Sequence, residues 1–249
     1  MPSLKRRGST KVYKTPSKRA RSRAFSRTKS KYAGTKRMIK KVLLNQSETK
    51  FTSYAYAVGG INHNSGALID LWTNNASSLF PTVGDSENNR DGNEIVGRGF
   101  MIRGMFNVPY DRRDVRIDMY YVQHNTNMGN PLTDLFHNVT GNKMLDPVNK
   151  KRWDNVKKLG SLRVKATDAG MHSTGSWLVD KVITKTIMFK RWIPMNKKLK
   201  FYADSASNVT NLPEMGRILF FAYDTLSSTG ADTVIHSGSV NATFYYKDP

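Results

Sequence analysis

Residues 115–122 read Val-Arg-Ile-Asp-Met-Tyr-Tyr-Val and carry the clearest structural signal in the chain. The first, third and fifth residues of this stretch are apolar, and the second and fourth are charged. Successive side chains of a β-strand point to opposite faces, so a period of two separates an apolar face from a polar one. The stretch therefore predicts a strand whose apolar face packs against a core.

The same alternation occurs towards both ends of the chain, at residues 53–58 and 240–246. Further strands are predicted from β-branched and aromatic content at residues 67–72, 99–108, 162–166, 183–191, 199–203 and 217–225. Short helices are expected at 131–136 and, after the Asp146-Pro147 pair, over 148–158. Eight or nine antiparallel strands with uneven loops predict an all-β protein, a single jelly-roll β-sandwich.

Positive charge is concentrated at the N-terminus. The chain has 249 residues, with 40 Lys plus Arg against 19 Asp plus Glu, a net charge of +21. The first carboxylate is Glu48, and residues 1–41 hold 16 of the basic residues, which leaves 24 basic and 19 acidic residues, or +5, for residues 42–249. We therefore divide the chain into a basic arm, residues 1–41, and a jelly-roll domain, residues 42–249.

The arm is rich in Ser, Thr, Lys and Arg and has few apolar residues, so it is expected to be disordered when free. A dense polycation gains free energy by releasing the counterions of nucleic acid. Tyr13, Phe25 and Tyr32 lie among the charges and could stack on unpaired bases. The nucleic-acid-binding residues predicted from this pattern are Lys5, Arg6, Arg7, Lys11, Lys14, Lys18, Arg19, Arg21, Arg23, Arg27, Lys29, Lys31, Lys36, Arg37, Lys40 and Lys41.

One cluster within the arm has the composition of a nuclear import signal: Lys18, Arg19, Arg21 and Arg23. A second basic segment, residues 185–200, contains six Lys and Arg residues that could extend the nucleic-acid surface beyond the arm: Lys185, Lys190, Arg191, Lys197, Lys198 and Lys200. The acidic residues around 85–94 have no established cation-binding spacing and favour a solvated loop over a cation site.

Catalytic chemistry has little support in the sequence. The chain has no Cys, and its five His residues form no metal-binding spacing, so neither a metal site nor a Cys nucleophile is predicted. Glycines 97, 99 and 104 lack the Gly-Lys-Ser/Thr of a phosphate loop. No apolar run is long enough for a membrane span. We expect a protein that is not an enzyme, uses no cofactor and does not insert into membranes.

Six segments in order resemble the coat proteins of small circular single-stranded DNA viruses, most closely the geminivirus-like branch: Gly-Arg-Gly-Phe-Met-Ile-Arg-Gly-Met-Phe at 97–106, the strand at 116–122, Pro-Leu-Thr-Asp-Leu-Phe at 131–136, Phe-Lys-Arg-Trp-Ile-Pro-Met-Asn-Lys-Lys at 189–198, Arg-Ile-Leu-Phe-Phe-Ala-Tyr at 217–223 and Ala-Thr-Phe-Tyr-Tyr-Lys-Asp at 242–248. The order and spacing of the segments are more specific than any one of them. The chain lacks the Cys and His residues that have been proposed as a zinc-finger-like element in plant-infecting members, so no metal site is carried over.

The resemblance implies a jelly-roll capsid protein that self-assembles into an icosahedral shell and packages a single-stranded DNA genome, with RNA as the weaker alternative. It also implies a location in the virion and the host nucleus, and import receptors of the host as partners. Two other functions stay open. One is a nuclear shuttle or another nucleic-acid-binding module that forms no shell, and the other is a nucleic-acid enzyme, which the scattered acids disfavour.

Overall fold

The computed structural model describes residues 34–36, 38–39, 42, 48–84, 86–109, 112, 114–153, 155–165, 184–202, 207–225 and 230–248. The chain divides into two units, Met1–Ser47 and Glu48–Pro249. In the first unit, residues 34–36, 38, 39 and 42 are helical and their side chains are exposed. The predicted disorder of the arm falls mostly on residues outside the described ranges and stays a prediction, as does the boundary at residues 41 and 42.

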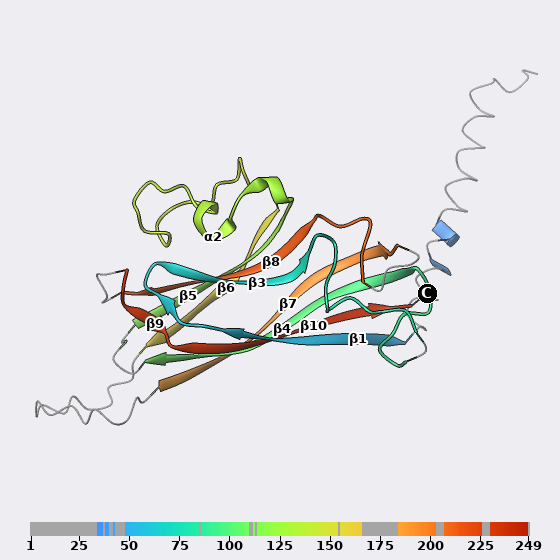
Figure 1. The fold of residues 1–249 in the computed structure, drawn as a ribbon, viewed down its shortest axis with the longest axis horizontal. Coiled ribbons are helices and arrows are strands. Elements are labelled where there is room, and N and C mark those ends of the chain that lie inside the picture. The colour runs from blue at the N-terminus through green and yellow to red at the C-terminus, as the bar shows by residue number, and fades with distance from the viewer. Residues whose placement is uncertain are drawn as a thin grey trace, which may run out of the picture. The chain divides into compact units, whose positions relative to one another are not determined.

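The second unit is a sandwich of two antiparallel sheets (Figure 1). The strands are β1 (Thr49–Val58), β2 (Ile61–Asn62), β3 (Ser65–Thr73), β4 (Glu94–Pro109), β5 (Asp114–His124), β6 (Val156–Lys165), β7 (Thr184–Lys200), β8 (Met215–Asp224), β9 (Thr233–Ile235) and β10 (Ser237–Lys247). One four-stranded sheet has the order β1-β10-β4-β7, and the other has the order β3-β8-β5-β6. The short strands β2 and β9 pair with each other.

The strand order is that of a jelly roll. If the eight long strands are numbered in chain order, the sheets read 1-8-3-6 and 2-7-4-5. The chain passes repeatedly from one sheet to the other, and its first and last strands are neighbours, as two interlocked Greek keys require. The predicted all-β jelly-roll sandwich is confirmed.

The main core fills the space between the two sheets. Alternate residues of every long strand point into it, because a sheet with one covered face buries every second side chain. Phe106 of the first sheet packs edge-on against Phe220 of the second, with ring centroids 5.1 Å apart. Trp72 of β3 stacks on Phe100 of β4 at 5.7 Å and donates its indole N–H to the Pro213 carbonyl at 2.8 Å.

A second apolar cluster covers the outer face of the sheet β3-β8-β5-β6. The segment between β5 and β6 contains the short helices η1 (Thr126–Met128) and α2 (Pro131–Asp134) and lies over this face (Figure 1). Leu135, Phe136 and Trp153 of the segment pack on Tyr120 and Phe221 of the sheet. Because this cover is apolar, the two central strands of the sheet, β8 and β5, are buried over most of their length on both faces.

Two details of the sequence prediction are wrong. Residues 183–191 and 199–203 were expected as separate strands, but β7 runs unbroken from Thr184 to Lys200. Pro194 is tolerated because β7 is an edge strand, where a missing N–H breaks no ladder on the open side. The expected helix over 148–158 is also absent, because Val148 forms a bridge with Phe136 and β6 begins at Val156.

The helix expected at 131–136 is present as α2, which the Asn130 side chain caps by accepting from the Leu132 N–H at 3.0 Å. No helix within the described ranges is long and apolar enough to cross a membrane.

Candidate nucleic-acid interface

The sixteen basic residues predicted in the arm are almost all outside the described part of the chain. Lys36 is described, and its side chain is exposed on helical backbone. The other fifteen, including the proposed import cluster at residues 18–23, lie outside the described ranges. Apart from Lys36, the described residues that could contact nucleic acid therefore belong to the sandwich.

The structure separates the six basic residues of segment 185–200 into three groups. Lys185 donates to the Lys165 carbonyl and Lys197 to the Asn211 carbonyl, so both side chains are hydrogen-bonded to the backbone of neighbouring segments. Arg191 lies against β6 at Gly160. The remaining three, Lys190, Lys198 and Lys200, lie on the outer side of β7.

Lys198 and Lys200 are both paired with the Glu94 carboxylate of β4. The hydrogen bond from Lys198 holds the pKa of Glu94 below its ordinary value of 4.5. Lys190 has no carboxylate partner among the described residues. Of the three lysines on the outer side of β7, Lys190 is thus the one whose charge is not paired with a described carboxylate.

Register places Arg103 of β4 directly opposite Lys190 of β7. Both side chains are exposed, and Arg103 likewise has no carboxylate partner in the described part of the chain. Two like charges directly across a ladder destabilise a sheet. The pair therefore forms a site of unneutralised positive charge at the middle of this face.

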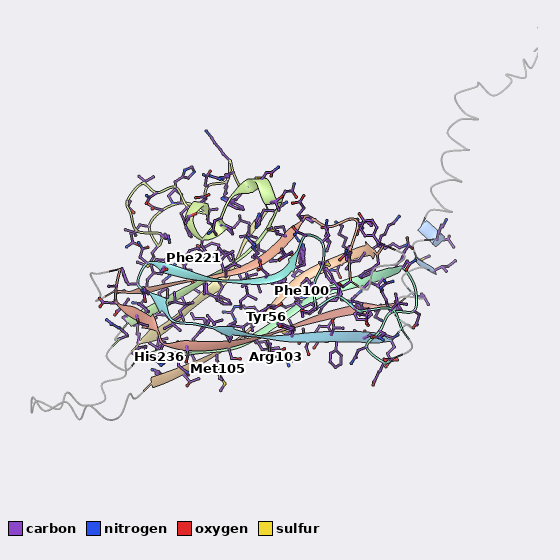
Figure 2. All side chains as sticks on the ribbon, viewed as in Figure 1. Tyr56, Phe100, Arg103, Met105, Phe221 and His236 are labelled. Carbon is purple, nitrogen blue, oxygen red and sulfur yellow. The ribbon has the colours of Figure 1, made fainter. Side chains whose placement is uncertain are left out.

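Four successive cross-strand rows lie in the middle of the outer side of the sheet β1-β10-β4-β7, and we call these sixteen residues the outer face. Read from β1 to β7, these rows are Phe51, Tyr245, Gly99 and Pro194; Ser53, Thr243, Met101 and Trp192; Ala55, Asn241, Arg103 and Lys190; and Ala57, Ser239, Met105 and Met188. None of these residues is acidic. In Figure 2, Arg103 and Met105 lie on the side of the sheet away from the second sheet, whereas Phe100 lies between the sheets.

Three aromatic rings form a continuous row across the outer face. Tyr245 of β10 lies between Phe51 of β1, at a centroid distance of 6.0 Å, and Trp192 of β7, at 5.8 Å. Phe51 is 48% exposed and Trp192 is 42% exposed. The Trp192 ring reaches Tyr245 across Gly99 of β4, where a Cβ would lie 2.7 Å from the indole Cζ2. Trp192 lies in the cross-strand row next to that of Arg103 and Lys190, whereas Phe51 and Tyr245 lie one row further away.

Sequence reasoning selected Lys190 but missed Phe51, Tyr245 and Arg103. Each lies on a separate strand, and only strand register brings the residues together. The available signal was the lack of acidic residues at the outward positions of these strands within the four rows.

Two acidic residues of the predicted loop around 85–94, Asp91 and Glu94, form ion pairs with lysines. Asp91 lies 3.5 Å from the Lys50 ammonium, which also contacts Asp248 at 3.3 Å. Among the residues that the structure describes, no group of three or more His, Asp and Glu side chains is placed to hold a metal ion.

A hollow of about 410 Å³ on the other side of the sandwich is lined by Arg116, Met144, Ser161, Arg163 and Thr225. Both guanidinium groups are already paired, Arg116 with Asp118 at 2.9 Å and Arg163 with Asp114 at 2.6 Å. This hollow therefore offers less available positive charge than the outer face.

Residues 139–146, in the segment that covers the second sheet, form a loop with two exposed apolar side chains. Val139 is 76% exposed and Leu145 is 66% exposed. The loop is braced by Asp146, which accepts hydrogen bonds from the Thr140 N–H at 2.8 Å and the Thr140 hydroxyl at 2.7 Å. These two apolar side chains are available for burial against another protein surface.

No family model matches the chain, and no curated protein matches it in sequence. Among solved structures it is similar to the VP2 protein of infectious bursal disease virus in a subviral particle, with a TM-score of 0.27 and 10% identity, covering 81% of this chain and 37% of that chain. It is also similar to T=1 particles derived from the same virus, with a TM-score of 0.21 and 7% identity, covering 83% of this chain and 41% of that chain.

The chain thus spans about two fifths of the solved chains that it matches.

Proposed function

We propose that this chain is a structural capsid protein, which self-assembles into an icosahedral shell and packages single-stranded DNA through its basic arm. The observation that carries the proposal is the presence of a jelly-roll sandwich and a 41-residue segment of charge +16 in one chain. Jelly rolls are a recurring fold of capsid domains. A polycationic segment neutralises packaged phosphate, which a shell around a genome requires.

Two features of the sandwich support this function. The outer face of the sheet β1-β10-β4-β7 adds positive charge and exposed rings, which suit contact with a strand. The loop 139–146 presents Val139 and Leu145, which suit burial against another copy. Neither role needs a catalytic group, so we propose a protein without enzymatic activity or cofactor.

We further propose that the cluster Lys18, Arg19, Arg21 and Arg23 binds host import receptors and directs the chain to the nucleus. Glutamine at these four positions should abolish nuclear accumulation of a fluorescent fusion. A control with glutamine at Lys5, Arg6, Arg7 and Lys11 removes the same charge and should leave import intact. Equal accumulation of both variants would reject the assignment.

The test of the main proposal is negative-stain electron microscopy of the full-length protein, with and without single-stranded DNA, combined with nuclease protection. Closed particles of uniform size that protect the strand are expected. If only small soluble species form across a range of salt concentrations, and they bind DNA without protecting it, the chain is instead a nuclear shuttle or another binding module. Equal protection of RNA in competition would reject the preference for DNA.

Removal of residues 1–41 separates the roles of the arm and the sandwich. The core residues all lie beyond residue 57, so the truncated chain should keep its β-sheet circular dichroism. Its salt-dependent affinity for DNA should fall steeply, since the net charge drops from +21 to +5. Retention of the full affinity and salt dependence would show that the arm is not the main binding segment.

A further inference from the structure

We propose that the outer face of the sheet β1-β10-β4-β7 is a site for single-stranded nucleic acid, in which a base stacks on the aromatic row and the adjacent phosphate binds between Arg103 and Lys190. The inference rests on the proposed function, because it assigns a second contact for the same packaged strand. It concerns the sandwich and does not depend on the arm.

Arg103 and Lys190 lie directly opposite each other on neighbouring strands. Neither has a carboxylate partner among the described residues, and none of the four rows of the outer face contains an acid. The protein thus keeps two like charges in direct opposition, an arrangement that an anion between them would stabilise. Elsewhere on the same sheet, Lys198 and Lys200 are balanced by Glu94, whereas Arg103 and Lys190 lie directly opposite each other with no such carboxylate among the described residues.

The aromatic row provides a surface of the kind that accepts unpaired bases. Phe51 and Trp192 are nearly half exposed on the outward side of their strands. Gly99 leaves open the position over which the indole extends, so the ring of Trp192 lies along the face. Every base has a flat apolar surface, and stacking on such rings is therefore tolerant of sequence.

The spacing between Trp192 and the Arg103–Lys190 pair fits a single strand of nucleic acid, as the geometry of the β-strands shows. Residues two apart along a strand are separated by about 7 Å, so the row of Trp192 lies one such step from the row of Lys190. That step is comparable with the separation of a base from the next phosphate in an extended chain. A duplex keeps its bases paired and stacked inside, so it can satisfy the cations but not the rings.

The test uses the full-length chain and a fluorescent oligothymidylate, with three variants whose folding is checked by circular dichroism. Trp192→Ala should weaken binding by about 5- to 150-fold without changing the salt dependence. Arg103→Gln combined with Lys190→Gln should reduce the slope of log K against log salt by about 1.4. Lys151→Gln combined with Lys157→Gln removes two exposed charges outside the outer face and serves as the control; its effect should be smaller than that of the Arg103 and Lys190 pair.

Ultraviolet cross-linking of the oligothymidylate, followed by peptide mapping, provides a readout that the arm cannot mask. Cross-links should occur in peptides containing Trp192, Tyr245 or Phe51, and a duplex of the same length should give none there. Trp192→Phe should restore most of the affinity lost in Trp192→Ala, because a ring remains.

The possible failures are distinguishable. If the wild-type chain forms nuclease-resistant particles but its cross-links fall in the arm alone, and the outer-face variants bind like the control, the outer face is not a nucleic-acid site although the capsid function stands. If the outer-face variants lose assembly in the absence of nucleic acid, the face is a contact between copies and the inference is wrong. If the wild-type chain neither binds nor protects a strand, both the inference and the proposed function fail.

Discussion

Trp192 of β7 lies across Gly99 of β4, and the two residues fit together because Gly99 has no Cβ. A Cβ at this position would lie 2.7 Å from the indole Cζ2 and would collide with the Ile193 carbonyl oxygen. The Gly99 backbone has a φ of 152°, which favours glycine, and the ladder between β4 and β7 shifts register here. The pair thus couples the backbone irregularity of β4 to the placement of an exposed ring.

Replacement of this glycine should disturb both the ladder and the ring. We expect Gly99→Ala to lower the free energy of unfolding by about 1–3 kcal/mol, because the carbonyl of Ile193 cannot move without breaking the pairing of β7. Thermal unfolding measures this change. Gly59→Ala, where a Cβ meets nothing within 4 Å, should change the melting temperature much less. Equal stability of both variants would show that β7 can shift freely at this point.

The Asp118 carboxylate should govern the stability of the sandwich in acid. Its side chain is 3% exposed and accepts hydrogen bonds from Arg116 at 2.9 Å, Lys158 at 2.9 Å and Ser161. Burial opposes ionisation, but these three donors outweigh it and hold the pKa of Asp118 below its ordinary value of 3.8. Because the unfolded chain takes up this proton at higher pH, the stabilisation is present above about pH 4 and is lost as the pH falls below it.

Asp118→Asn should therefore destabilise the protein at neutral pH, by about 1–3 kcal/mol, and reduce the further loss of stability in acid. The charged partners are partly exposed, which limits the cost. Urea unfolding at pH 7 and below pH 4 provides the measurement. Glu87→Gln, on an exposed loop, is the control and should retain the wild-type profile.

His124 should cause a separate loss of stability on acidification, which begins at a higher pH than the loss due to Asp118. The ring is 4% exposed, its Nδ1 lies 2.9 Å from the Asn125 carbonyl, and its Nε2 has no hydrogen-bond partner among the described residues. Burial lowers the pKa of His124 below 6.5, with Arg217 acting in the same direction and Asp70 and Glu214 opposing it. The unfolded chain therefore binds the proton first, and the free energy of unfolding should fall as the pH drops below about 6.5.

His124→Gln should flatten this decrease between about pH 7 and pH 5, as measured by urea unfolding at a series of pH values. The exposed His137→Gln is the matched control. If His124→Gln and the control have the same pH profile, protonation of His124 does not limit stability.

The loop 139–146 should act in assembly and contribute little to folding. We expect Val139→Ser combined with Leu145→Ser to leave the melting temperature within about 2 °C of the wild type, because both side chains are largely exposed. Particle formation, followed by light scattering and electron microscopy, should fall sharply. Lys151→Ser, in the same segment, should assemble normally. Unchanged particle yield in the double variant would remove this loop from the contacts between copies.

The fold class and the uneven distribution of charge can be predicted from the amino-acid sequence. Alternation at 115–122 and 240–246 gave strands because side chains of a strand point to alternate faces, which is a local property of the chain. The sixteen basic residues before Glu48 were likewise visible without any coordinates. Local patterns also indicated α2, because the Asn130 cap and Pro131 lie next to each other in sequence.

Which side chains share a surface, in contrast, depends on the tertiary structure. Phe51, Arg103, Lys190 and Tyr245 come from four strands, and their shared surface depends on a register that long-range packing fixes. The same packing continued β7 through Pro194, because an edge strand does not need that N–H, and converted the expected helix at 148–158 into a loop and a strand. Local periodicity predicts which faces a strand has, whereas the neighbours of each face depend on how the whole chain is folded.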